Sequence, residues 1–315
     1  MAHLEPAERG VPGVQHRARH HTAPLPDRYP EERPVEQTAV VKPPAKSRAG
    51  RNLRAAIAVG VSLGLVVLAS LLFWRPGFVF VVGVGAVTGV WEMVRAMGHS
   101  GRRAPLLPLL AGALVMVALA WFAGPEGLTL GLALTVLAVM VWRLADGPLG
   151  YQRDLLAAVL VAAYVPFLGS FAVLLDRPDD GRLRVIVLLA AVVLSDTGGY
   201  AAGVFLGRHK MAPTVSPGKS WEGAAGSLVT AAAGGAVMLR LLFHVPWWHG
   251  ALFGAGVAAA AVLGDLAESL LKRDLEIKDM SNLLPGHGGV MDRVDSILFA
   301  APAGFVLFSM LVPPA

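Results

Sequence analysis

The sequence contains no cysteine and few charged residues. Of its 315 residues, 16% are charged and 55% are hydrophobic, whereas a soluble domain has about 25% charged residues. The absence of cysteine excludes disulfides, thiolate metal sites and a cysteine nucleophile. The shortage of charge, together with long apolar runs, argues against an ordinary soluble domain and favours a chain that lies mostly within a membrane.

The N-terminal part differs from the rest of the chain. Residues 1–51 are rich in Pro, Arg, Glu and His and poor in large apolar residues. A segment of this composition cannot bury a core, so we expect a disordered cytoplasmic tail. Residues 52–315 are predicted to form one polytopic membrane domain that carries the activity.

Nine apolar segments follow the tail, each long enough, or nearly so, to cross about 30 Å of hydrocarbon at 1.5 Å per residue. They are Leu53–Trp74, Phe78–Met97, Pro105–Ala123, Leu128–Leu144, Leu155–Leu175, Val185–Leu206, Trp221–Phe243, Ala251–Leu271 and Ile297–Val312. The predicted fold class is therefore an all-α integral membrane protein with about nine transmembrane helices.

Basic residues favour one side of these segments. The tail is basic, and the loops after the second, fourth, sixth and eighth segments carry Arg102, Arg103, Arg153, Arg208, Lys210, Lys219, Lys272, Arg273, Lys278 and Arg293. The opposite loops carry only Arg75, Arg177, Arg182 and Arg184. The positive-inside rule then predicts an N-in, C-out protein of the cytoplasmic (inner) membrane, with a polar cavity facing the cytoplasm. The net charge of +5 indicates contact with anionic lipid, not with nucleic acid.

One predicted helix presents several polar side chains on a single face. In the run G-D-L-A-E-S-L-L-K-R, Asp265, Glu268, Ser269 and Lys272 lie at i, i+3, i+4 and i+7. At 1.5 Å per residue, Asp265 lies roughly 10 Å deeper in the membrane than Lys272. An acid at that depth must face a polar cavity, a metal or a cation. The alternative is an internal Asp265–Lys272 pair that locks helices together.

The run P-G-H-G-G-V-M-D-R-V-D-S contains groups suited to phosphate and metal. Its glycines, Gly286, Gly288 and Gly289, allow positive φ and let backbone N–H groups approach a phosphate. Asp292 and Asp295 begin the last helix, and with Asp265 they form an all-oxygen site that suits Mg²⁺. Phosphate-binding cations surround this run: Lys272, Arg273, Lys278 and Arg293. His287 either binds phosphate, acts as an acid or base, or holds the turn.

A third region lies upstream. Asp196 stands in S-D-T-G-G-Y, where Gly198 and Gly199 are expected to interrupt the helix and open a cavity. The loop V-S-P-G-K-S-W-E-G then supplies Ser216, Lys219 and Glu222 as phosphate contacts, or else forms an amphipathic connector. It is not a P-loop, because Pro213 replaces the first glycine and no strand is expected before it. Farther upstream, Glu92 and Arg95 are expected to pair with each other.

These residues resemble a known family. The stretch S-L-L-K-R-D-L-E-I-K-D-M-S-N-L-L-P-G-H-G-G-V-M-D-R-V-D, from Ser269 to Asp295, resembles the hallmark of the phosphatidate cytidylyltransferases (CDP-diacylglycerol synthases). S-D-T-G-G-Y and S-P-G-K-S-W-E-G, from Ser216 to Gly223, are similar to internal motifs of that family. The resemblance spans roughly Leu53 to the C-terminus and implies transfer of CMP from CTP to phosphatidic acid, a step of phospholipid biosynthesis.

The resemblance also implies roles for residues. The implied catalytic residues are Lys272, Arg273, Asp292, Arg293 and His287. The implied substrate-binding residues are Ser216, Lys219, Glu222, Ser269, Lys278, Asp279, Gly286, Gly288 and Gly289. The implied metal ligands are Asp265, Asp292, Asp295 and Asp196, with Mg²⁺ and a second cation such as K⁺ as cofactors. A homodimer is implied too. The alternatives are a cytidylyltransferase acting on another lipid phosphate, an ion-coupled membrane transporter, and a structural scaffold.

Overall fold

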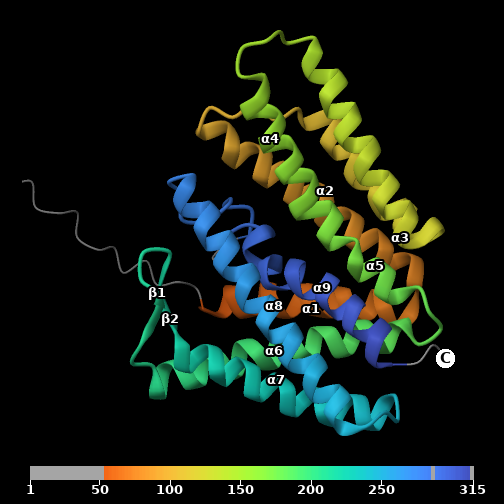
Figure 1. Cartoon of the computed structure of the whole chain (residues 1–315), viewed down its shortest axis with the longest axis vertical. Helices are drawn as coiled ribbons and strands as arrows, with labels where there is room; N and C mark the ends of the chain where they lie inside the picture. Colours follow the sequence, from red (N-terminus) through yellow and green to blue (C-terminus); the bar gives the residue numbers. More distant parts are fainter. Residues whose placement is uncertain (1–52, 285–287, 313–315) are drawn as a thin grey trace, which may run out of the picture. The chain divides into compact units, whose positions relative to one another are not determined.

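The structure is a computed structural model that describes residues 53–284 and 288–312, with side chains described from Gly60 onward. The predicted tail at residues 1–51 therefore lies outside the described residues. The described chain is mostly helical (Figure 1). Its helices are α1 (Leu53–Phe73), α2 (Arg75–His99), α3 (Leu106–Leu144), α4 (Tyr151–Ala162), the π-helical η1 (Ala163–Phe167), α5 (Phe171–Asp176), α6 (Gly181–Leu206), α7 (Trp221–Leu242), α8 (Trp247–Asp274) and α9 (Met291–Leu311).

The helices have the length and composition of membrane spans. Within the described residues, seven helical stretches are long and apolar enough to cross a membrane, with Tyr151–Asp176 counted as one stretch. The predicted class, a helical multi-pass membrane protein, is confirmed. The all-α expectation misses one feature, a short antiparallel hairpin of β1 (Lys210–Ala212) and β2 (Ser216–Ser220) between α6 and α7.

The longest helix, α3, folds back on itself. Its backbone breaks at Gly124, which has φ 75° and ψ −152° and stands directly before Pro125. Only glycine adopts this conformation readily, and proline cannot continue the preceding helix. The two halves then lie side by side, since a Cβ added at Gly131 would lie 3.0 Å from the Met116 side chain. The break falls between the two apolar segments expected from the sequence.

Small residues bring α6, α7 and α8 close together. A Cβ added at Gly226 of α7 would lie 2.8 Å from the Gly198 carbonyl oxygen of α6, and one at Gly235 of α7 would lie 3.0 Å from the backbone of Gly254 in α8. Gly198 does not interrupt α6, which continues to Leu206. The expectation of a broken helix there was wrong, because these glycines serve close packing of helix backbones.

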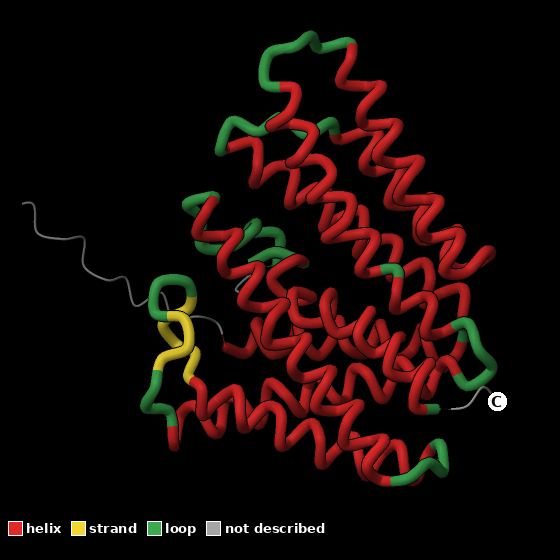
Figure 2. Tube along the Cα trace, viewed as in Figure 1, coloured by secondary structure: helices red, strands yellow, loops and turns green. Residues whose placement is uncertain are grey.

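The loops gather at two ends of the helical body (Figure 2). At one end, called here the site end, Arg102 of the α2–α3 loop pairs with Asp274 of α8 at 2.9 Å. There too, the Arg273 Nε of α8 donates to the carbonyl of Val215 in the hairpin at 3.3 Å. At the opposite end, Arg75 of α2 donates to the Pro178 carbonyl of the α5–α6 loop at 2.6 Å. The predicted polar motifs belong to loops and helix ends of the site end, except the Asp196 motif, which lies within α6.

Candidate active site

Asp265, on the polar face of α8, contacts the hairpin. The Lys219 Nζ of β2 lies 2.6 Å from Asp265 Oδ2. Ser269, one turn along α8, donates to Asp265 Oδ1 at 3.3 Å. Asp265 therefore has a cation as its partner, as its depth required, but the cation is Lys219. The alternative of an Asp265–Lys272 pair is wrong, because the Lys272 ammonium binds Asp292 and Glu268 instead.

A polar cavity opens beside this pair. Its volume is about 440 Å³, within the range of roughly 300–1,000 Å³ typical of small-molecule sites. It is lined by α6, β1, β2, α7, α8 and α9, and its polar side chains are Asp196, Tyr200, Lys219, Ser220, Ser227, Asp265 and Ser296. The two upstream motifs and the α8 face, far apart in sequence, thus share one cavity.

Lys272, on the same face of α8, forms a buried ion pair with Asp292. Lys272 Nζ lies 2.8 Å from Asp292 Oδ1 and 3.5 Å from Glu268 Oε1. Glu268 is fully buried, and neither of its oxygens accepts a hydrogen bond within the part of the chain that the structure describes. The carboxyl group of Asp295, on α9, lies near Glu268, so the two acidic groups influence each other electrostatically. Glu268 was noted on this face from the sequence but was given no role there.

Asp292 holds the loop that precedes α9. Its Oδ2 accepts the backbone N–H groups of Met280 at 2.9 Å and Gly289 at 2.8 Å, in addition to the Lys272 contact on Oδ1. Gly288 has φ 78°, the left-handed conformation that glycine favours. The Gly289 N–H, which was expected to face a phosphate, is thus hydrogen-bonded to Asp292. The other two members of that glycine turn, Gly286 and His287, lie outside the described residues.

Glu92 of α2 also binds this loop. It is fully buried and accepts hydrogen bonds from Ser281 Oγ at 2.6 Å and from the backbone N–H groups of Val290 and Met291 at 2.9 Å each. Since these two N–H groups open α9, Glu92 caps that helix with a negative charge. The predicted Glu92–Arg95 pair was wrong, because the Arg95 guanidinium lies over the Trp91 ring at 5.4 Å.

Glu222 organises the start of the hairpin. It accepts from His209 Nδ1 at 2.6 Å and from the Arg208 backbone N–H at 3.1 Å. Ser216 pairs with Ala212 across the hairpin. The structure therefore places Glu222 and Ser216 in contacts that shape the loop carrying Lys219. Four predicted residues are exposed at the site end: Arg273, Lys278, Asp279 and Arg293.

The donors at this site fit a hard cation. Five carboxylates interact electrostatically here, and two ammonium groups form ion pairs with some of them. The carboxylates are Asp196, Asp265, Glu268, Asp292 and Asp295, and the ammonium groups are those of Lys219 and Lys272. This excess of negative charge and the all-oxygen donor set suit Mg²⁺ or K⁺, and in the described chain the Glu268 oxygens accept no hydrogen bond although Lys272 lies 3.5 Å from one of them. Within the described residues, however, no three of these groups are gathered around one point.

Fold and site together define a helical multi-pass membrane protein in which the motif residues of α6, the hairpin and α8 line one cavity. Residues 54–311 match the model of the Cytidylyltransferase family, and the chain belongs to that family. It is 42% identical over 295 residues to the phosphatidate cytidylyltransferase of Mycobacterium bovis, covering 90% of this chain and 96% of that one. It is 35% identical over 252 residues to that of Pseudomonas aeruginosa, covering 73% and 88%. An uncharacterized Escherichia coli protein, YnbB, is 39% identical over 127 residues, 40% of this chain and 43% of that one.

Proposed function

We propose that this enzyme transfers CMP from CTP to phosphatidic acid and releases CDP-diacylglycerol and pyrophosphate. The observation that carries the proposal is the cavity where Lys219 and Asp265 meet, next to the Lys272–Asp292 pair. It combines cations for a triphosphate with carboxylates for a metal, at the end of apolar helices where a lipid phosphate lies. Membership of the Cytidylyltransferase family and the similarity to phosphatidate cytidylyltransferases support the same reaction.

The chemistry requires little proton transfer. A phosphate oxygen of phosphatidic acid attacks the α-phosphorus of CTP, the bond from that phosphorus to the bridging oxygen breaks, and pyrophosphate leaves with the electron pair. The attacking oxygen is already anionic at neutral pH, so no strong general base is needed. The main barrier is repulsion between two anionic substrates, and Lys219, Lys272 and Arg273 reduce it while they position the phosphates.

We propose that Asp196, Asp265 and Asp295 hold the cation together with phosphate oxygens of CTP, because within the described residues these carboxylates alone are not gathered around one point. These carboxylates interact with one another beside the cavity. Asp292, in contrast, already has three donors and serves as the anchor of the loop. Bound Mg²⁺ supplies positive charge that offsets the charge developing on the triphosphate. A second cation such as K⁺ suits Glu268 Oε2, which has neither a hydrogen bond nor an ion pair within the described residues.

The predicted topology is part of the proposal. It has nine crossings, with α1 as the first and the two halves of α3 counted separately, and the site end faces the cytoplasm of the inner membrane. Because the sequence has no cysteine, single cysteines report topology cleanly. Asp179→Cys, at the opposite end, is expected to react with an impermeant maleimide in intact cells, and Glu276→Cys, at the site end, only after permeabilisation. The reverse pattern contradicts the orientation. The homodimer stays a prediction.

The reaction is tested with purified full-length protein in mixed micelles. We expect CDP-diacylglycerol and pyrophosphate in equal amounts from CTP and phosphatidic acid, and weak competition by ATP, GTP or UTP. Chelation of divalent cations is expected to abolish turnover, and added Mg²⁺ to restore it. Activity on another lipid phosphate but not on phosphatidic acid would favour the sister reaction. Ion transport by reconstituted protein without CTP would favour the transporter, although the motif charges lie at one end of the helices.

A further inference from the structure

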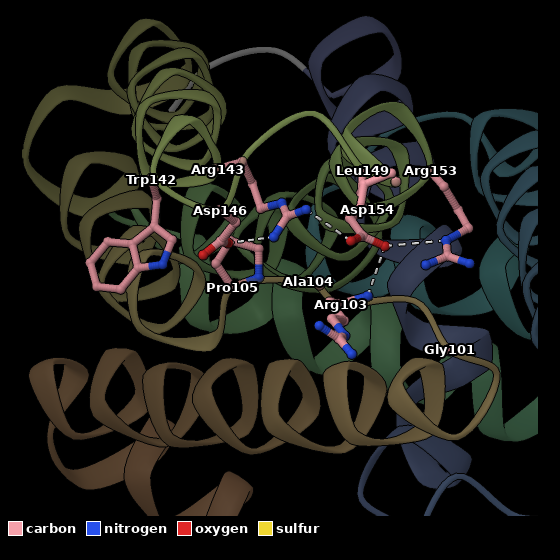
Figure 3. A pocket seen from close by; sticks show the side chains of 11 residues that line it. Gly101, Arg103, Ala104, Pro105, Trp142, Arg143, Asp146, Leu149, Arg153 and Asp154 are labelled. Atoms are coloured by element: carbon pink, nitrogen blue, oxygen red, sulfur yellow. Dashed lines mark hydrogen bonds and ion pairs between the residues drawn. The ribbon is translucent and has the colours of Figure 1, made fainter.

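A larger cavity lies elsewhere at the site end, between the α2–α3 loop, the end of α3 and the start of α4 (Figure 3). Its volume is about 810 Å³, and it shares no lining residue with the cavity beside Lys219. None of the residues predicted to act in catalysis lines it. Its chemistry comes from three guanidinium groups and two carboxylates: Arg103, Arg143, Arg153, Asp146 and Asp154.

The most buried of these guanidiniums keeps one donor unused. Arg143 is 4% exposed. It pairs with Asp146 and donates from Nη2 to Asp154 Oδ2 at 3.0 Å. Its Nε is buried and has no partner within the part of the chain that the structure describes. A buried cationic side chain with an unused donor is costly, so an anion bound in the adjacent cavity is expected to stabilise Arg143 through its charge.

Asp154 binds the backbone of Arg103 and the side chain of Arg153 beside the cavity. It is 1% exposed and accepts the backbone N–H of Arg103 at 2.9 Å and the Arg153 Nε at 3.3 Å. Figure 3 shows the guanidinium groups of Arg143 and Arg153 reaching this carboxylate, whereas Arg103 reaches it only through its backbone N–H. The three arginines outnumber the two carboxylates of Asp146 and Asp154, so the cavity carries a net positive charge that favours an anion.

The cavity has an apolar edge at a membrane boundary. Trp142 and Leu149 line it and are 48% and 89% exposed. They stand where the candidate spans Leu106–Leu144 and Tyr151–Asp176 end and begin. An aromatic and an aliphatic side chain at this level suit the interface between lipid tails and headgroups.

We propose that this cavity binds the phosphate group of an anionic membrane lipid, separate from the site of CMP transfer. The guanidinium forks of Arg103 and Arg153 contact the phosphate oxygens, in the geometry by which arginine binds phosphate, and the buried Arg143 adds its positive charge from the wall of the cavity. The acyl chains leave the cavity past Trp142 and Leu149. A free phosphate offers the same oxygens but no chains, so the experiment must separate the two sources.

The test uses the full-length protein in nanodiscs of phosphatidylcholine with or without phosphatidylglycerol, and native mass spectrometry counts retained lipids. Wild type is expected to keep phosphatidylglycerol preferentially. The double variant Arg103→Ala/Arg153→Ala is expected to bind it at least about tenfold more weakly, because two charge-assisted contacts are lost. Arg103→Lys/Arg153→Lys is expected to fall between the two. Equal retention by wild type and the alanine variant would overturn the proposal.

Two controls sharpen the result. Arg95→Ala removes an exposed arginine at the end of α2 that does not line the cavity, and it is expected to leave retention unchanged. Equal losses in Arg95→Ala would mean that general surface charge binds the lipid, against the proposal. Inorganic phosphate at millimolar concentration is expected not to displace the lipid. If it binds at the arginines while phosphatidylglycerol does not, the lipid source is wrong.

Discussion

Asp265 and Asp292 carry the same chemical group but have different surroundings. The Asp265 side chain is 38% exposed and is held by Lys219 and one serine hydroxyl beside the cavity. The Asp292 side chain is 4% exposed, and both its oxygens already accept donors. The resemblance to the family gave both the same role. The structure separates them into an open carboxylate that can exchange its partner and a closed one that fixes a loop.

The difference follows from the donors around each group. A ligand or metal can replace one exposed lysine contact at little cost, because exposed ion pairs contribute about 0–1 kcal/mol. Displacing a buried lysine and two backbone N–H groups leaves those donors without partners, at about 1–3 kcal/mol for each. We therefore expect substitutions at Asp265 to act on chemistry alone and substitutions at Asp292 to act on folding as well.

Asp265→Asn is expected to have the largest effect on activity. The substitution keeps the shape of the side chain but removes the charge that holds a cation, so turnover is expected to fall by about a thousandfold. The midpoint of thermal unfolding is expected to stay within about 2 °C of wild type, because only a partly exposed pair with Lys219 is lost. CMP transfer to phosphatidic acid and a thermal unfolding curve on the same preparation measure both quantities.

A matched control is Glu276→Gln, which also converts a carboxylate to an amide at the site end, on an exposed residue. It is expected to change neither rate nor stability. A drop of more than about 5 °C in Asp265→Asn would show that Asp265 is as structural as Asp292, and the contrast between the two would fail.

Asp292→Asn is expected to have a smaller direct effect on chemistry and a larger one on stability. It leaves the Lys272 ammonium buried beside Glu268 and weakens two backbone contacts. Breaking a buried pair from one side costs about 3–5 kcal/mol, so the unfolding midpoint is expected to fall by at least about 5 °C. Activity of the folded fraction is expected to fall by about a hundredfold. An unchanged midpoint would remove Asp292 from its anchoring role.

Part of this contrast was visible in the sequence. Asp265, Glu268, Ser269 and Lys272 repeat at helical spacing, and the structure does place them on one polar face of α8. Local periodicity predicts such a face because it depends on one helix alone. The apolar segments were predictable for the same reason, as was the break of α3 between two of them.

Contacts between distant segments were not predictable in this way. Glu92 binds Met291 across 199 positions, and nothing in its own helix distinguishes it from a residue that pairs with Arg95. The Gly289 N–H was assigned to a phosphate because glycine spacing reveals backbone freedom but not which acceptor is present. The partner of Lys219 likewise depends on how the hairpin folds over α8. The only available signal for Glu92 was an acid near the end of an apolar segment.

Of the three substitutions, Glu92→Gln is expected to have the smallest effect. It tests whether Glu92 of α2 fixes the loop before α9 as Asp292 does. Glutamine keeps one acceptor oxygen but loses the charge that caps α9, so one or more contacts to Ser281, Val290 and Met291 weaken. We expect turnover to fall by about tenfold, with faster amide hydrogen exchange confined to residues 275–291. Glu126→Gln, an exposed acid of α3, is the control and is expected to change neither. Slower turnover without faster exchange in the loop would place Glu92 in direct contact with substrate. Faster exchange across the whole bundle would show that Glu92 stabilises the fold as a whole and not the loop in particular.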